Sequence, residues 1–182
     1  MIFAQIDIAA LSNWFSENKI NDSVDKIARL QIYFELIDSW STRVNLVSRA
    51  DIPLLVKNHF LDSLAPIEMI PHSSSLIDVG SGAGLPGIPL AIARPDISVT
   101  LLESVHKKVL FLRQAILKLA LQNVSVIEGR LEEMDRSKNY DIATVRALPK
   151  IERQIERIHN LVKPGGKIIY YEKRGVYKAI HI

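Results

Sequence analysis

The residues best suited to chemistry lie between positions 75 and 87, where the chain reads Ser-Leu-Ile-Asp-Val-Gly-Ser-Gly-Ala-Gly-Leu-Pro-Gly. A short apolar run leads into glycines at positions 80, 82 and 84, and then into Pro86. This order predicts a buried strand, a tight turn and a helix with proline at its first position. Gly80, Gly82 and Gly84 have no Cβ, so the backbone can approach a ligand closely there. We therefore expect a large, flat ligand at this turn.

Two cofactor classes fit the turn. Residues 82–87 match G-x-G-x-x-G, the fingerprint of NAD-binding proteins. However, a pyrophosphate is bound by the free N–H groups at the start of the following helix, and Pro86 removes one of them. Asp78 and Gly80 extend the pattern to D-x-G-x-G-x-G, which resembles motif I of class I S-adenosylmethionine (SAM) methyltransferases. SAM has no phosphate, so its loop needs close approach rather than an anion site. NAD, and a turn that binds no ligand, are the alternatives.

Glu103 is the second candidate for ligand binding. It ends a predicted strand over residues 98–103, about twenty residues after the glycines, where an acid often binds a ribose. A carboxylate can accept hydrogen bonds from both sugar hydroxyls. NAD and SAM both carry an adenosine ribose, so Glu103 does not distinguish them. An exposed strand-end glutamate is the alternative.

Composition narrows the class of protein. The chain has 182 residues, 48% of them hydrophobic, which fits a single domain. Cysteine is absent, which excludes a disulfide framework and thiolate chemistry. The first residues lack the basic segment of a signal peptide, and no apolar run reaches membrane-spanning length. We expect a soluble, cytoplasmic monomer. The net charge of +3 neither requires nor excludes a nucleic-acid partner.

The elements that position these residues follow from periodicity. A helical region is predicted over residues 7–64, with a loop at 40–49, and it includes an apolar stripe at Ile27, Leu30, Phe34 and Ile37. From Ser75 onwards strands and helices alternate. The predicted strands are 76–79, 98–103, 124–128, 140–146 and 167–172, and the predicted helices are 86–93, 106–121 and 149–162. This alternation indicates an α/β fold with a doubly wound, mostly parallel sheet at 71–182, covered by a helical cap at 1–70. Ligands of such sheets bind beyond the carboxyl ends of the strands.

A longer stretch carries a more specific resemblance. Residues 76–90, with Leu-Pro-Gly-Ile-Pro-Leu after the glycines, and then Arg94-Pro95, are similar to the signature of the bacterial 16S rRNA guanine-N7 methyltransferases, also called glucose-inhibited division protein B. Residues 45–48, 59–63, 107–112 and 145–147 resemble the same family, so the similarity spans about residues 25 to 173. It implies a class I (Rossmann-like) fold, SAM as cofactor, and 16S rRNA of the small ribosomal subunit as substrate. Guanine N7 has a free lone pair, which agrees with the lack of an obvious general base.

The resemblance also implies roles for individual residues. It implies SAM contacts at Gly80 and Leu85 in the glycine turn, and at Leu131 and Glu132, where the adenine would lie. Arg146, at the end of the fourth predicted strand, matches the arginine of the family's cofactor site. We expect Arg146 to be required for turnover and its replacement by alanine to leave the fold intact. The alternatives are a surface turn at 131–132 and a strand-end ion pair for Arg146.

Four residues are candidates for RNA contact. Lys107 and Lys108 lie in the first turn of the helix predicted from residue 106. Cations there oppose the helix dipole, which suggests a purpose outside the helix such as binding an RNA backbone. Arg130 follows the third strand and can reach the same rim. His59 borders the site in the family resemblance, although a satisfied buried histidine is the alternative. For the lysines the alternative is a solvated helix face.

The C-terminal segment departs from the family pattern. Members continue after the fifth strand with a helix and an antiparallel hairpin, whereas this chain reads Glu172-Lys173-Arg174-Gly175 and ends at Ile182. We therefore expect the C-terminal strands to be truncated, a seven-stranded sheet to be incomplete, and the edge of the fifth strand to be exposed. A SAM-binding protein without catalysis is the alternative function that this departure suggests.

Overall fold

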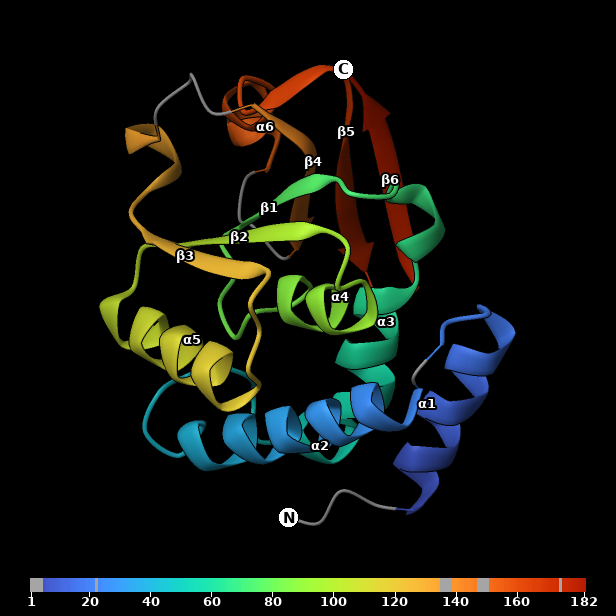
Figure 1. Cartoon of the computed structure of the whole chain (residues 1–182). Coiled ribbons are helices and arrows are strands. Elements are labelled where there is room, and N and C mark those ends of the chain that lie inside the picture. Colours follow the sequence, from blue (N-terminus) through green and yellow to red (C-terminus); the bar gives the residue numbers. More distant parts are fainter. Residues whose placement is uncertain (1–4, 22, 135–138, 147–150, 174) are drawn as a thin grey trace.

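A mostly parallel sheet of six strands forms the centre of the described part of the chain (Figure 1). The computed structural model describes residues 5–21, 23–134, 139–146, 151–173 and 175–182. The strand order is β3-β2-β1-β4-β5-β6, and the first five strands are parallel while β6 runs antiparallel to β5. The bounds are β1 Ser75–Val79, β2 Ser98–Glu103, β3 Val124–Glu128, β4 Tyr140–Arg146, β5 Val162–Lys173 and β6 Val176–His181. The predicted doubly wound α/β fold is confirmed.

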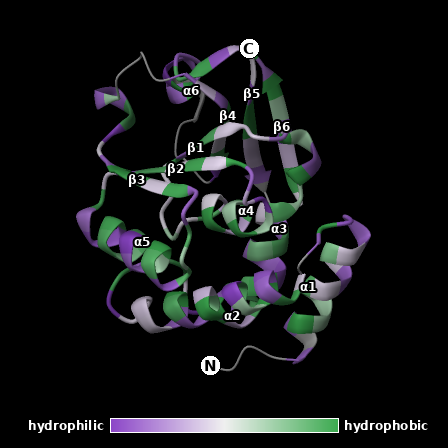
Figure 2. Ribbon diagram, viewed as in Figure 1, coloured by the Kyte–Doolittle hydropathy of each residue, from purple (hydrophilic) through white to green (hydrophobic). Residues whose placement is uncertain are grey.

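Helices cover both faces of the sheet. In Figure 1, α2, α4 and α5 lie on one side of β1–β3 and α6 lies on the other. The bounds are α1 Gln5–Glu17, α2 Ser23–Trp40, α3 Leu61–Leu64, α4 Gly87–Ala93, α5 His106–Lys118 and α6 Ile151–His159. Both α2 and α5 carry hydrophobic and hydrophilic patches along their length (Figure 2). In the described ranges, no helix combines the length and the apolar character that crossing a bilayer requires.

Alternation along the strands creates two hydrophobic clusters. Leu76 and Leu101 belong to the cluster on the side of the N-terminal helices. Ile77 and Leu102, their neighbours in sequence, belong to the cluster on the side of α6. This is the pattern of a sheet that is buried on both faces. The first cluster also includes Phe15 and other side chains of α1 and α2. The division into a cap and a core at residue 70 stays a prediction.

Several predicted boundaries were wrong. The helix predicted near residues 52–64 is present without a break, but its type changes along the segment: a 3₁₀ turn at Ile52–Leu54, a π-helix at Val56–Phe60, and α3. Helix α5 ends at Lys118, three residues before the predicted end. Helix α4 begins at Gly87, so Pro86 precedes the helix and does not occupy its first position. The amide of Gly87, in the first turn of this helix, donates to the buried carboxylate of Asp78.

The predicted exposed edge of the fifth strand was also wrong. Strand β6 pairs with β5 along most of its length, with Ile168 opposite Ile180 and Tyr171 opposite Tyr177. The two strands are joined at Gly175, whose φ of +69° is a conformation that favours glycine in tight turns. The predicted turn at residues 164–166 lies within β5, since Gly165 and Gly166 exchange backbone hydrogen bonds with Ile182.

Close packing at Gly87 generates a prediction about stability. A Cβ added to Gly87 would lie 2.4 Å from Cδ2 of Leu101 and 2.9 Å from Oδ2 of Asp78. Gly129 is a matched control, because the nearest atom to its added Cβ is Oε2 of Glu133 at 3.8 Å. We expect Gly87→Ala to lower the free energy of unfolding by about 1–3 kcal/mol through overpacking. Gly129→Ala should change it by less than about 0.5 kcal/mol. Urea denaturation of both variants checks this, and equal midpoints would contradict the packing argument.

Candidate functional site

The glycine turn has the backbone geometry that its sequence predicts. Gly80, Gly82 and Gly84 have φ values of +73°, +58° and +85°, a region that side chains with a Cβ seldom adopt. The reasons for glycine differ between positions. A Cβ on Gly82 would meet only the carbonyl oxygen of Gly80, at 3.8 Å, so this side of the turn is open to a ligand. A Cβ on Gly84 would lie 2.5 Å from Cδ1 of Ile88, so this glycine is required by packing within the protein. Leu85 is buried in the first hydrophobic cluster.

Asp78 fixes the shape of this turn from beneath. Its side chain is buried, and Oδ2 accepts a hydrogen bond from the amide of Gly87 at 3.0 Å. Oδ1 accepts one from the hydroxyl of Thr144 on β4, also at 3.0 Å. Burial raises the pKa of Asp78 to about 6, although both hydrogen bonds oppose that rise. Asp78 therefore connects β1, the start of α4 and β4, and its carboxylate faces the protein.

Glu103 lies at the carboxyl end of β2, beside the glycine turn. It is buried, and Oε2 accepts a hydrogen bond from the amide of Gly82 at 2.8 Å. Oε1 accepts one from the amide of Val105, also at 2.8 Å. Each carboxylate oxygen has a second lone pair, so these bonds leave acceptor capacity for hydroxyl groups. The structure thus brings the predicted ribose acid to the predicted loop, while ribose binding itself stays a prediction.

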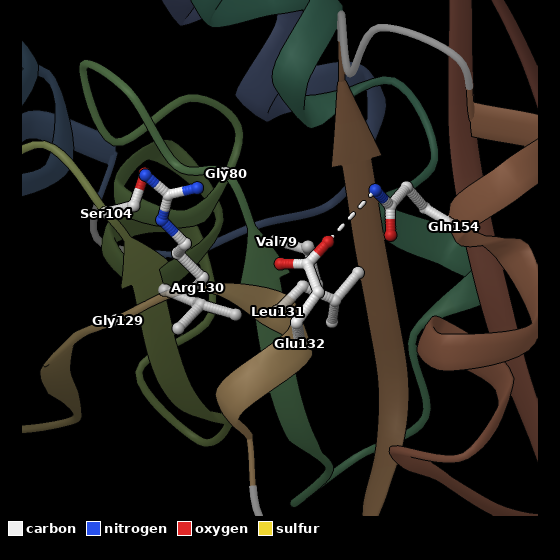
Figure 3. A pocket seen from close by; sticks show the side chains of 9 residues that line it. Val79, Gly80, Ser104, Gly129, Arg130, Leu131, Glu132 and Gln154 are labelled. Carbon is white, nitrogen blue, oxygen red and sulfur yellow. Dashed lines mark hydrogen bonds between the residues drawn. The ribbon is translucent and has the colours of Figure 1, made fainter.

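A pocket opens at the carboxyl ends of β1, β2 and β3 (Figure 3). It encloses about 190 Å³, which is enough for part of a nucleoside and less than the roughly 300–1,000 Å³ of typical ligand sites. Its lining residues are Val79, Gly80, Leu102, Ser104, Gly129, Arg130, Leu131, Glu132 and Gln154. Gly80, Leu131 and Glu132 were predicted as one cofactor site from segments fifty residues apart, and here they share one cavity. Arg130, predicted at an RNA rim, is part of the same wall.

Gln154 also lines this pocket, and it is not among the residues that the sequence predicts. This residue lies on α6, and its Nε2 donates to Oε1 of Glu132 at 3.2 Å, as the dashed line in Figure 3 shows. Arg157 of the same helix donates to the same oxygen at 3.2 Å. The feature of the sequence that could have indicated Gln154 is a polar residue on the helix that follows β4. Helix α6 therefore supplies one side of the pocket.

Arg146 ends β4 and lies within a largely buried polar network. Its Nη2 is 3.0 Å from Oδ2 of Asp62, and the two side chains are 15% and 7% exposed. The same nitrogen donates to the carbonyl of Asn58 at 3.1 Å and lies 3.2 Å from Nδ1 of His59. The guanidinium carbon lies 6.0 Å from the centre of the Tyr171 ring. The strand-end ion pair that the sequence left as an alternative is thus present, and it does not exclude a second role for Arg146.

Asp62 extends this network to the C-terminal hairpin. Its Oδ1 accepts a hydrogen bond from the amide of Gly175, between β5 and β6, at 2.7 Å. The hydroxyl of Tyr171 donates to the carbonyl of Ser63 at 2.8 Å. Removing the guanidinium of Arg146 would leave the carboxylate of Asp62 buried without its cation, which is costly. The expectation that Arg146→Ala leaves the fold intact is therefore replaced by an expected loss of stability.

The remaining RNA candidates lie in different surroundings. Lys107 is exposed on the first turn of α5, whereas Lys108 is half-buried. The side chain of His59 is 16% exposed, and its Nε2 lies 4.0 Å from Oδ1 of Asp51. His59 therefore belongs to the network around Arg146 and contributes little to the exposed surface. Within the residues that the structure describes, no group of three His, Cys, Asp or Glu side chains could hold a metal ion.

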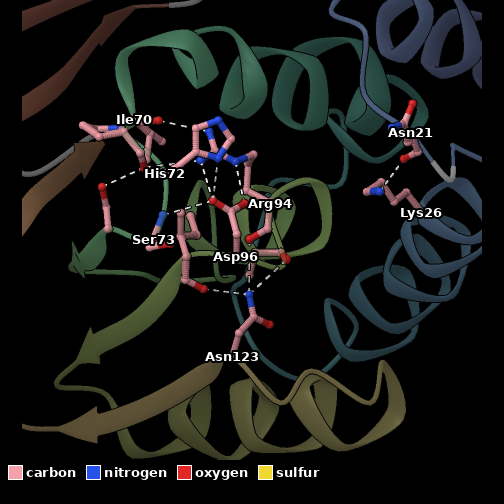
Figure 4. Close-up of polar contacts among 12 residues, drawn as sticks. Asn21, Lys26, Ile70, His72, Ser73, Arg94, Asp96 and Asn123 are labelled. Atoms are coloured by element: carbon pink, nitrogen blue, oxygen red, sulfur yellow. Dashed lines mark hydrogen bonds and ion pairs between the residues drawn. The ribbon is translucent and has the colours of Figure 1, made fainter.

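Arg94 of the Arg-Pro pair lies near the amino ends of β1 and β2, among the polar contacts that Figure 4 shows. Its Nε and Nη2 donate to the two carboxylate oxygens of Asp96, each at 2.7 Å, and its Nη1 donates to the carbonyl of Ile70 at 3.0 Å. The amide of Ser73 also donates to Asp96, at 3.1 Å. The hydrogen bonds from Arg94 hold the pKa of Asp96 well below its usual range. This cluster joins the segments that enter β1 and β2, so its role is structural.

The raised pKa of Asp78 predicts how stability depends on pH. The folded protein binds a proton at Asp78 below about pH 6, whereas the unfolded chain releases it near pH 3.8. The contribution of Asp78 to stability should therefore fall as pH rises from about 4 to 6, and stay constant above 7. The fall should be up to roughly 3 kcal/mol, at about 1.4 kcal/mol per pKa unit. Urea denaturation of the wild type and Asp78→Asn across this range checks it. A wild-type stability that rises relative to that of Asp78→Asn between pH 4 and 6 would contradict this expectation.

The amino-acid sequence of this chain is similar to those of one known protein family. The family model described as GidB, rRNA small subunit methyltransferase G, matches residues 26–181. The protein named Ribosomal RNA small subunit methyltransferase G from Xanthomonas campestris pv. campestris (strain B100) is 42% identical over 171 residues, covering 93% of this chain and 77% of that protein. The protein of the same name from Chromobacterium violaceum is 38% identical over 152 residues, covering 84% of this chain and 72% of that protein.

Solved structures support the fold. A putative S-adenosyl-L-methionine-dependent methyltransferase from Methanococcus maripaludis aligns with a TM-score of 0.58 at 19% identity, covering 75% of this chain and 61% of that chain. A SAM-dependent methyltransferase from Aquifex aeolicus aligns with a TM-score of 0.55 at 18% identity, covering 65% and 66%. The predicted methyltransferase fold and the family resemblance are both confirmed. The chain belongs to the rRNA small subunit methyltransferase G family.

Proposed function

We propose that this protein transfers the methyl group of SAM to N7 of a guanine in 16S rRNA of the small ribosomal subunit. The observation that carries the proposal is the pocket beside the glycine turn and Glu103, in a member of this family. NAD fits less well. Pro86 has no N–H, and the amide of Gly87 is already bonded to Asp78, so two donors that a pyrophosphate needs are missing.

The residues present fit SAM. The open side of Gly82 and the spare acceptor capacity of Glu103 suit a ribose and its amino-acid extension. Leu131 and Glu132, across the pocket, suit the apolar face and the amino group of an adenine. Arg146 is a fixed cation at the carboxyl end of β4 and can pair with a carboxylate such as that of the methionine moiety. When bound, SAM supplies an electrophilic methyl group.

The chain's own residues then act by positioning the guanine and the cofactor relative to each other. Guanine N7 carries a lone pair in the neutral base, so no proton has to be removed before attack. The protein contributes alignment and exclusion of water, and orientation alone can lower a barrier by roughly 7–11 kcal/mol in favourable cases. Arg146 suits this role because Asp62 and the Asn58 carbonyl hold its guanidinium in one place. In the proposal Arg146 is the catalytic residue, and Asp62 positions it.

The substrate is an accessible guanine. The major groove of an A-form RNA helix is too deep and narrow for side chains to reach N7. The target should therefore lie in a loop or a distorted region, presented by the assembled small subunit to a monomeric enzyme in the cytoplasm. The alternative of a SAM-binding protein without catalysis was suggested by the short C-terminal segment, and β6 pairs with β5 in that segment to complete a six-stranded sheet.

Mapping the methyl group tests the proposed reaction. Small subunits from a strain that lacks this gene, incubated with the protein and SAM, should gain one N7-methylguanine in 16S rRNA. Mass spectrometry of ribonuclease fragments identifies the base and the atom. Methylation of another atom, or of no rRNA base while SAM binding is normal by calorimetry, would contradict the proposal.

Two replacements of Arg146 separate its structural role from its role in turnover. Arg146→Lys keeps a cation beside Asp62 but loses the forked geometry, so it should stay folded and lower kcat by about 10–100-fold. Arg146→Ala should also lose about 3–5 kcal/mol of stability. Activity assays and urea denaturation of both variants distinguish the two effects. Normal kcat in a folded Arg146→Lys variant would remove Arg146 from the mechanism.

A further inference from the structure

A second groove lies between the end of α2 and the first turns of α5. Its lining residues are Ser39, Trp40, Arg43, Val44, Lys107 and Leu110, and we name it the α2–α5 groove. It encloses about 490 Å³, which lies within the range of small-molecule sites and is larger than the pocket beside the glycine turn. None of the roles proposed for the first pocket uses it.

The charged residues that line the α2–α5 groove are all cations. Two of its six lining residues, Arg43 and Lys107, are cations with exposed side chains, and none of the six is acidic. In the described ranges neither cation lies within ion-pair distance of a carboxylate. The groove therefore suits an anionic ligand.

The floor of the groove is aromatic and apolar. Trp40 is half-buried, and its ring meets the buried Phe111 edge-on, with centroids 5.6 Å apart and planes at 65°. The amides of Arg43 and Val44 both donate to the carbonyl of Trp40 at 2.9 Å, which folds the following loop beside the ring. Leu110 adds an apolar side chain that is 43% exposed. A fixed indole with cations beside it is the arrangement that proteins use for unpaired nucleotides.

The α2–α5 groove also lies on the same side of the sheet's strands as the pocket beside the glycine turn, near their carboxyl ends. Helix α5 begins three residues after the end of β2, so Lys107 is near the carboxyl ends of the strands, and residues at the end of α2 line the same groove. Phe111, which supports Trp40, lies 6.5 Å from the ring of Tyr33. The Tyr33 hydroxyl donates to the carbonyl of Ala83 in the glycine turn. One row of aromatic side chains therefore supports both the groove and the turn.

We propose that the α2–α5 groove binds an unpaired nucleotide of the rRNA substrate near the target guanine. The base lies against Trp40 and Leu110, and the adjoining phosphates contact Arg43 and Lys107. This inference rests on the proposed function and adds a specific RNA subsite to it. An acidic peptide would also meet the two cations, but the indole and the pocket volume favour a planar base.

Trp40 provides a direct optical test. The chain has two tryptophans, so Trp14→Phe leaves Trp40 as the single tryptophan reporter. Titration with an unstructured hexaribonucleotide should quench its fluorescence. In the same background, Arg43→Gln and Lys107→Gln should each weaken binding about 3–10-fold and reduce the slope of log affinity against log salt by about 0.7. Lys118→Gln, an exposed lysine at the other end of α5, is the matched control and should change neither.

Steady-state kinetics with small ribosomal subunits as substrate distinguish a failure of the proposed subsite from a failure of the proposed reaction. Trp40→Leu, Arg43→Gln and Lys107→Gln should raise KM for the subunit about 10-fold, while affinity for SAM by calorimetry stays within twofold. If the wild type methylates rRNA and these variants show an unchanged KM, the subsite is refuted and the proposed function stands. Quenching of Trp40 by a polyglutamate peptide but not by the oligoribonucleotide would also overturn it. Absence of methylation by the wild type counts against the reaction itself.

Discussion

The buried carboxylate of Asp78 is the constraint on which the candidate site depends. It receives the amide of Gly87 and the hydroxyl of Thr144, so one side chain fixes where β1 ends, where α4 begins and how β4 lies beside them. A buried carboxylate is costly unless it is hydrogen-bonded, and burial raises its pKa to about 6 despite both bonds. The glycine turn spans the gap between β1 and α4, so its shape follows from this anchor. The pocket beside the turn is a consequence of the same arrangement.

A second buried interaction joins distant parts of the chain around the site. Asp62 lies between the guanidinium of Arg146 and the amide of Gly175, and so links α3, β4 and the C-terminal hairpin. A buried ion pair contributes little net stability, because desolvation offsets the attraction. The effect of this ion pair is to hold the side chains of Asp62 and Arg146 in place, because either buried charge without the other is strongly unfavourable. This explains how one arginine can be a structural cation and also a fixed group for the proposed reaction.

The features that could be predicted from the sequence are those that local residue patterns determine. Strands β1 to β4 and the glycine turn follow from local apolar runs and glycine spacing, and the carboxyl-edge rule brings Gly80 and Leu131 into one pocket. The failures involve distant partners. Residues 164–166 read as a turn, but Gly165 and Gly166 bond to Ile182, which no local pattern shows. Gln154 was missed because its place in the pocket depends on how α6 returns to the sheet.

The aromatic row changes how the N-terminal helices relate to the site. Considered as a cap, residues 1–70 would only cover the sheet. Yet Tyr33 of α2 stacks on Phe60 with ring centroids 5.2 Å apart, and its hydroxyl reaches the carbonyl of Ala83, fifty residues away in the chain. A Cβ on Gly84 would come within 3.0 Å of that hydroxyl, so the turn is fitted to the tyrosine. Tyr33 thus holds the turn from the side of α2, while Asp78 holds it from the side of the sheet. The N-terminal helices are therefore part of the site's framework.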